Sequence, residues 1–230
     1  MKILWGALAV NGRGKLGGHV LTKARSCATM RTRVTPANPQ TAAQSSVRSS
    51  FAQISRSWSG LTAAQREAFN SAVAGYARTN VFGNSYNPSG KNLFTQLNLN
   101  LQNVGAPTRT TVPSTKRSLG IVLDAVHTSI KDSEMDITVT VTGTVNGNAF
   151  IVLEATPPMS AGRYNFSGSY RKFHQLAHNA SPDPIAIYAD YVSKFGEPEL
   201  GQKISVRAKI VTVLSALASP YSSFDEVVGN

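Results

Sequence analysis

Two groups of residues have types and spacings that could support chemistry, and the first is a glycine pattern near the start. Residues 12–17 read Gly-Arg-Gly-Lys-Leu-Gly and fit G-x-G-x-x-G. In dinucleotide-binding folds that pattern leads into a helix, and an acid follows about 20 residues later. The first acid of this chain is Glu67. We therefore interpret the glycines as hairpin turns and expect no cofactor.

The second group consists of histidines and one cysteine. His174 and His178 are four residues apart, but the residues between them are Gln-Leu-Ala, without the glutamate of a zinc protease. We interpret them as solvated or packed side chains and expect no metal site. Cys27 has no second cysteine to pair with, no histidine lies near it in sequence, and no G-x-S-x-G elbow exists. We expect no catalytic residues and no enzyme activity.

The distribution of charge is more informative than any motif. Residues 1–118 contain 15 basic residues and one acidic residue, a net charge of +14, whereas residues 119–230 contain eight basic and 11 acidic residues, a net charge of −3. A long segment of one sign predicts a partner of the opposite sign. Three interpretations stay open: contact with a nucleic-acid backbone, docking on an acidic protein surface, or a solvated face. Few aromatic residues interleave with the early basic residues, which argues against base stacking.

The basic residues of the first 34 positions are the candidate contacts to DNA or another anionic partner. Alternate residues of an extended chain share a face. Lys23, Arg25, Arg31 and Arg33 all have odd numbers, so they are predicted to form a single cationic stripe. The candidates are Arg13, Lys15, Lys23, Arg25, Arg31 and Arg33.

Residues 1–34 are predicted to form a basic extended arm or β-hairpin. The apolar run from Ile3 to Val10 reads as a strand, Asn11-Gly12 as a turn, and residues 19–22 as the returning strand. The apolar run is too short for a membrane span and lacks a signal-peptide cleavage pattern.

Residues 35–105 are predicted to form short helices. Thr-Ala-Ala-Gln occurs at 41–44 and again at 62–65, and each copy is a capping box that starts a helix. A third helix is predicted from Lys91 to about Val104, closed by Gly-Ala-Pro at 105–107. Apolar residues at helical spacing are the candidate assembly contacts: Val47, Phe51, Ile54, Trp58, Phe69 and Phe94.

Residues 106–118 read as a linker, and residues 119–230 as an antiparallel β-sandwich. From 119 onward the apolar period changes to two, as in Met135, Ile137, Val139 and Val141, and the same alternation predicts strands at 150–154 and 204–210. About seven short strands with frequent turns are typical of an immunoglobulin-like or fibronectin type III-like domain. A short helix is predicted within 184–195. The expected fold class is therefore α+β.

Several short segments resemble uncharacterised virion structural proteins of tailed phages and prophages of Bacteroides-related bacteria, crAss-like phages among them. In the N-terminal half they include Gly-Lys-Leu-Gly at 14–17, Arg-Val-Thr-Pro-Ala-Asn-Pro-Gln-Thr at 33–41 and Gln-Arg-Glu-Ala-Phe at 65–69. In the C-terminal half they include residues 155–162, 194–196 and 204–207, which resemble an accompanying fibronectin-like domain.

The resemblance implies a virion component assembled in the host cytoplasm. The expected function is a neck, collar or tail ring protein that forms a cyclic homo-oligomer through its basic N-terminal half. The alternatives are a capsid decoration protein or a non-specific DNA-binding virion protein. The expected partners are further copies, portal, neck, tail or capsid proteins, and packaged double-stranded DNA through phosphate contacts, but no membrane.

Overall fold

The computed structural model describes most of the chain and divides it into two compact units. Both units contain antiparallel sheet, and the described residues also include four α-helices, so the α+β class is confirmed. The N-terminal unit comprises Met1–Leu99 and Arg109–Val112, and the C-terminal unit comprises Asn100–Thr108 and Pro113–Asn230. The described residues are 2–4, 12–23, 26–114, 120–129, 134–142, 148–178 and 185–229.

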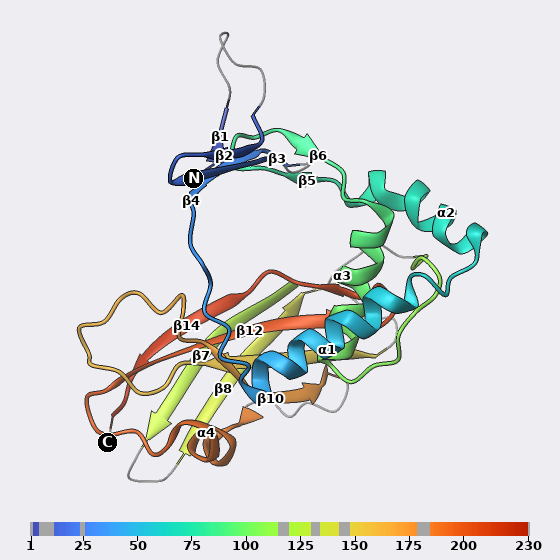
Figure 1. Ribbon diagram of the computed structural model, residues 1–230. Helices are drawn as coiled ribbons and strands as arrows, with labels where there is room; N and C mark the ends of the chain where they lie inside the picture. Colours follow the sequence, from blue (N-terminus) through green and yellow to red (C-terminus); the bar gives the residue numbers. More distant parts are fainter. Residues whose placement is uncertain are drawn as a thin grey trace. The chain divides into compact units, whose positions relative to one another are not determined.

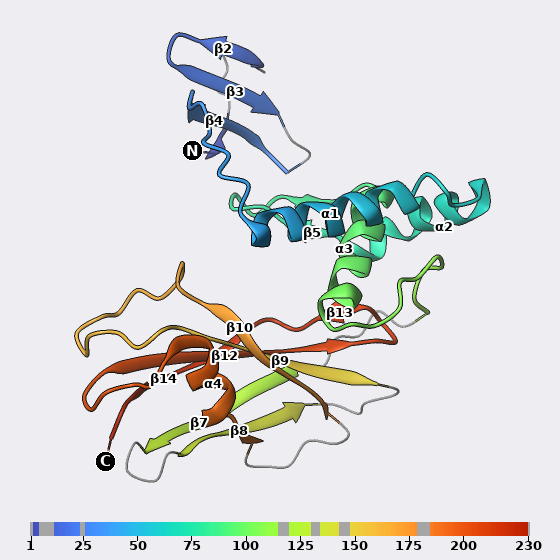
Figure 2. The ribbon, with the colours of Figure 1, turned by 60° about the horizontal axis from the view of Figure 1, so that its bottom comes forward.

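The N-terminal unit begins with a four-stranded antiparallel sheet in the order β1-β4-β3-β2. Figure 2 shows β2, β3 and β4 side by side. The sheet corrects the expectation of an extended arm with a single hairpin. The returning strand at 19–22 is confirmed as part of β3, but its turn is at Gly17, where φ is 55°. Residues 5–11, where the first strand and its turn were predicted, lie outside the described residues. The strands are β1 (Lys2–Ile3), β2 (Gly14–Leu16), β3 (His19–Lys23) and β4 (Ala28–Thr32).

Helices follow the sheet close to where the capping signals predict them (Figure 1). Thr62 forms a complete capping box with Gln65. Thr41 accepts a hydrogen bond from the Gln44 backbone. Of the two hydrogen bonds of the first predicted capping box, only this one forms. A short hairpin, β5 and β6, separates the second helix from the third. The elements are α1 (Ala42–Ser57), α2 (Ala63–Ala72), the 3₁₀ helix η1 (Val73–Tyr76), β5 (Arg78–Thr79), β6 (Ser85–Tyr86) and α3 (Gly90–Asn103).

Aromatic rings hold the three helices of the N-terminal unit together. The Phe69 and Phe94 rings meet edge to face with centroids 5.3 Å apart, and the Trp58 ring lies 5.5 Å from Phe94 and 6.0 Å from Phe69. Gly90 starts α3 against α2, where a Cβ would lie 2.2 Å from Asn70 Oδ1. Asn98 donates to the Arg109 carbonyl and accepts from the Arg109 amide. The side chain of Asn98 therefore fixes the returning chain beside α3.

The third helix ends as its sequence predicts. Gly105 has φ 71°, its amide donates to the Gln102 carbonyl, and the Ala106 amide donates to the Leu101 carbonyl. These two bonds form a Schellman motif, which needs a residue in the left-handed region at the position of Gly105. In the C-terminal unit Val104 then packs against Val152 and Val211.

The C-terminal unit contains two antiparallel sheets. The larger has the order β10-β9-β12, with β13 and β14 also paired to β12, and the smaller has the order β11-β8-β7. The predicted strands at 135–141, 150–154 and 204–210 and the predicted short helix are all present. The elements are β7 (Gly120–Ser129), β8 (Glu134–Thr142), β9 (Ala149–Ala155), β10 (Arg171–Ala177), β11 (Ile185–Ala186), α4 (Tyr188–Phe195), β12 (Lys203–Thr212), β13 (Leu217–Ala218) and β14 (Ser222–Val227).

One hydrophobic core joins the two sheets and α4. Alternate residues of β9 and β12, among them Leu153 and Val206, are fully buried in it, as is Met135 of β8, and Leu123 of β7 is also buried. Tyr191 of α4 is also fully buried, and its hydroxyl donates to the Thr156 carbonyl at 2.9 Å. Burial raises the Tyr191 pKa, so this phenol stays a neutral donor.

Candidate interaction surfaces

The basic residues predicted to contact an anionic partner lie on or beside the N-terminal sheet. Lys15 is in β2, Lys23 ends β3 and Arg31 is in β4. Arg13 directly precedes β2, and the Arg33 amide donates to the Gly18 carbonyl just beyond β4. All five are exposed. Arg25 lies outside the described residues.

The strand register corrects the predicted single stripe. Lys23 is paired with Ala28, and Arg31 with Val20. Directly paired residues share a face and alternate residues do not, so Lys23 and Arg31 lie on opposite faces. The reason is the chain reversal between β3 and β4, which breaks the odd numbering that a continuous strand would preserve.

The same register assigns three basic residues to one face. Lys15 pairs with Val20, which pairs with Arg31, and Lys2 pairs with Thr29, two residues from Arg31. We call this the cationic face, and the opposite one the apolar face. The cationic face consists of Lys2, Lys15, Val20, Thr22, Thr29 and Arg31. The apolar face consists of Ile3, Gly14, Leu16, His19, Leu21, Lys23, Ala28, Met30 and Thr32.

The six apolar candidates for assembly contacts divide into two groups by their exposure to solvent. Ile54, Phe69 and Phe94 are at most 2% exposed, and Trp58 packs on both Phe69 and Phe94. Packing inside the chain removes the three buried residues from the candidate assembly contacts, because a partner cannot reach them. Two candidates remain open: Val47 is 70% exposed and Phe51 52% exposed.

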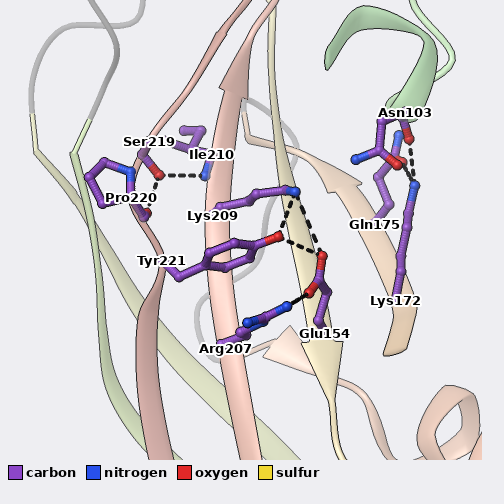
Figure 3. A network of polar contacts seen from close by, with 10 residues as sticks. All are labelled: Asn103, Glu154, Lys172, Gln175, Arg207, Lys209, Ile210, Ser219, Pro220 and Tyr221. Atoms are coloured by element: carbon purple, nitrogen blue, oxygen red, sulfur yellow. Dashed lines mark hydrogen bonds and ion pairs between the residues drawn. The ribbon is translucent and has the colours of Figure 1, made fainter. Parts of the chain in front are cut away.

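Sequence reasoning missed a third surface, a polar network on the outer face of the larger sheet of the C-terminal unit (Figure 3). Glu154 of β9 is paired with Lys172 of β10 on one side and Arg207 of β12 on the other. Arg207 donates to Glu154 Oε2 from Nε at 2.8 Å and from Nη2 at 2.5 Å. Its guanidinium lies between the rings of Tyr170 and Tyr221, 4.1 Å from each centroid.

Two further donors complete the surroundings of Glu154. The Tyr221 hydroxyl donates to Oε1 at 2.8 Å, and Lys209 Nζ lies 3.6 Å from Oε1 and 2.7 Å from the Tyr221 oxygen. Burial alone would raise the pKa of Glu154, but the hydrogen bonds from Arg207 and Tyr221 and the charges of Lys209 and Arg207 lower it overall. Glu154 is therefore an ionised acceptor with occupied oxygens, an arrangement that locks strands together and does not suit proton transfer.

Lys172 links this sheet to the end of α3 within the C-terminal unit. Its Nζ donates to the Asn103 carbonyl at 2.6 Å and to Gln175 Oε1 at 2.7 Å, and Gln175 Nε2 donates to the Val104 carbonyl at 3.0 Å. These bonds satisfy carbonyls that a helix C-terminus leaves open and place a cation at the negative end of its dipole. Burial and the charge of Lys209 lower the pKa of Lys172.

A signal for this network was present in the sequence, but its pairing was not. Arg207 and Lys209 are alternate residues of a predicted strand, and Glu154 ends another. The periodicity places each of them on the polar side of its strand. Which residues lie opposite one another depends on a register between strands some 50 residues apart, and no local pattern encodes that.

The histidines and the cysteine with possible chemistry belong to different units. His174 is in β10 and pairs through Nδ1 with Asp190 Oδ2 of α4 at 2.5 Å, and His178 follows the end of the same strand. Cys27 Sγ lies 3.7 Å from the Ser26 hydroxyl in the N-terminal unit. Within the described ranges, no three His, Cys, Asp or Glu side chains are grouped so that they could hold a metal ion.

Comparison with protein-family models, curated proteins and solved structures gives no match to this chain. In the part of the chain that the structure describes, no helix combines the length and apolar character needed to cross a membrane.

Proposed function

We propose that this chain is a structural protein of a tailed-phage virion. In this proposal it forms a ring in the neck, collar or tail through its N-terminal half and displays the C-terminal unit as a separately folded domain. The short segments that resemble phage virion proteins supply the biological setting. The distribution of burial supplies the physical support.

The observation that carries the proposal is the degree of burial in the described part of the first quarter of the chain. None of the described residues from 2 to 53 is buried, although they include a four-stranded sheet and most of a 16-residue helix. Ordering a backbone costs about 1–2 kcal/mol per residue, and burial of apolar surface is the main compensation. A segment whose described residues are at most half-buried by its own chain needs neighbours to cover it.

The exposed part of α1 shows where one such neighbour would pack. Val47, Phe51, Ile54 and Trp58 follow one another at spacings of four, three and four residues, the seam of a helix that packs on another helix. The second half of this seam is covered by the chain's own helices, and the first half is not. We infer that a neighbouring subunit continues the packing over Val47 and Phe51.

The C-terminal unit is proposed to be a fibronectin type III-like sandwich. Its chain passes through β7 and β8 in one sheet, β9 and β10 in the other, returns to β11, and finishes in β12 and β14. In a constant-type immunoglobulin domain the fourth strand joins the sheet of the first, second and fifth. Here the fourth strand, β10, pairs with β9 instead, which favours the fibronectin variant of the architecture.

The test is the mass of the full-length protein in solution, measured by light scattering over a range of concentrations. We expect the full-length protein to be an oligomer. A variant that lacks residues 2–34 and the double variant Val47→Ser/Phe51→Ser should each have a lower mass than the full-length protein. Val81→Ser is the matched control, because Val81 is 66% exposed but lies outside the α1 seam. A full-length monomer at all concentrations, unaffected by these changes, would contradict the proposal. Imaging of labelled particles then separates a neck position from the capsid.

A further inference from the structure

The N-terminal sheet presents two chemically different faces. The apolar face carries Ile3, Leu21 and Met30, all half-buried, and Leu16, which is 65% exposed. The cationic face carries three exposed basic side chains and one large apolar residue, Val20. A sheet divided in this way fits a protein surface on one side and a hydrated, charged partner on the other.

The cationic face has no compensating charge of its own. The chain contains no acid before Glu67, and Lys2, Lys15 and Arg31 have no ion pair or side-chain hydrogen bond among the described residues. Lys15 and Arg31 lie in one row two strands apart, roughly 10 Å between Cα atoms. At that spacing a polyanion such as a phosphate backbone can engage each cation separately.

The composition of the cationic face favours nucleic acid over protein. Protein interfaces concentrate their binding energy in buried aromatic residues and arginines, and the six described residues of this face include no aromatic residue. It offers lysine, arginine and the hydroxyls of Thr22 and Thr29, which lie 2.6 Å apart, and such groups are typical contacts to phosphate and sugar. The lack of aromatic side chains argues against a single strand, because bases of a single strand are held by stacking.

We propose that the cationic face of the N-terminal sheet binds the phosphate backbone of double-stranded DNA without sequence preference. Lys2, Lys15 and Arg31 each neutralise one phosphate, and the apolar face packs on protein. The inference rests on the proposed function only for its natural source of DNA, the packaged genome. The contact itself requires the sheet and its register.

The experiment measures binding of the full-length chain to a random-sequence DNA duplex between 50 and 200 mM salt. Each phosphate contact adds about 0.9 to the slope of log affinity against log salt. We therefore expect Lys15→Ala and Arg31→Ala each to lower the slope by about 0.9 and affinity several-fold, and the double variant to lower the slope by about 1.8. Lys23→Ala removes the same charge from the opposite face, so it should leave the slope unchanged and alter the affinity by no more than about twofold.

Two outcomes would overturn the proposal. One is the absence of duplex binding at 50 mM salt, which would assign the cationic face to an acidic protein surface. The other is an equal loss in Lys23→Ala and Lys15→Ala, which would mean that net charge and not the face determines binding. Light scattering on the same samples distinguishes failure of this inference from failure of the proposed assembly. An oligomer that does not bind DNA refutes only this inference. A monomer that binds DNA refutes only the proposed assembly.

Discussion

Residues 2–53 and the larger sheet of the C-terminal unit differ in how far their side chains are buried and in how their charges are paired. The first region has strands and a helix but no buried residue among those described, and its charge has one sign. The second region alternates fully buried side chains such as Leu153 with outward charges, and there Glu154 is bonded or close to Arg207, Lys209 and Tyr221. Regular secondary structure therefore does not by itself indicate a self-sufficient fold.

The difference shows how to recognise a segment that is completed by partners. In the sheet of the C-terminal unit, cations are stacked on rings or bonded to carboxylates within the same chain. In the N-terminal sheet, Lys2, Lys15 and Arg31 have no ion pair with a described residue, and no described residue of the four strands is fully buried. Burial and charge pairing are both absent from the same described residues, which is the pattern expected of an assembly surface.

The largest effect that separates the two regions is expected from identical leucine substitutions. Leu153 is fully buried, so Leu153→Ala should lower the free energy of unfolding by about 3 kcal/mol through lost burial and a cavity. Leu16 is 65% exposed, so Leu16→Ala should change it by no more than about 0.5 kcal/mol. Chemical denaturation monitored by circular dichroism at a concentration that keeps the chain monomeric measures both. Equal losses would show that the N-terminal sheet has a core after all.

A medium effect is expected from removing the central charge of the polar network. Glu154→Gln leaves Arg207 and Lys209 without their carboxylate and should cost about 2 kcal/mol. Because the pKa of Glu154 is lower in the fold than its ordinary value of 4.5, its contribution is present above that value. It is lost as pH falls through the lowered pKa.

Unfolding curves across this acid range provide the readout. The wild type should lose stability steeply below pH 4.5, and Glu154→Gln should lose less. Glu67→Gln, which changes an exposed carboxylate on α2, is the matched control and should follow the wild type. If the profile of Glu154→Gln has the same steepness as the wild type, the network does not stabilise the sheet.

The smallest effect is expected at the two helix caps. Thr62→Ala removes the hydrogen bond from the Gln65 amide to the Thr62 hydroxyl, one of the two bonds of a complete capping box. The helix packs in the core through Phe69, so the change should cost about 1 kcal/mol. Thr41→Ala removes one bond of 3.3 Å from the exposed end of α1, where fraying is not coupled to a core. It should cost at most a few tenths of a kcal/mol, measurable by thermal unfolding. A larger loss at Thr41 than at Thr62 would place the start of α1 in the cooperative fold.

Local signals were sufficient for most elements of the fold. The threonine caps, Gly105 and the alternating apolar residues of β9 and β12 predicted the helices and several strands, because capping, turn geometry and side-chain period act over a few residues. Strand β7, the β5–β6 hairpin and the short strands β11 and β13 were not assigned individually. Short strands of two residues carry no period to detect.

The candidate surfaces could be predicted only in part. The basic residues 13–33 were identified from composition, but the face that each occupies was wrong for Lys23 because a reversal separates it from Arg31. Ile54, Phe69 and Phe94 had the right spacing for a packing stripe, but spacing cannot say whether the partner is another helix of the same chain or another subunit.

The sequence by itself determined the segregation of charge, the order of helices and strands, and the place where a helical half gives way to a β half. Those properties depend on composition and on short-range backbone preferences. Only the tertiary structure decided which cations share a face, which apolar residues are buried, and that Glu154 is paired with Arg207. Those properties depend on register and packing between residues far apart in the chain, and the free energy that selects them is shared among many contacts.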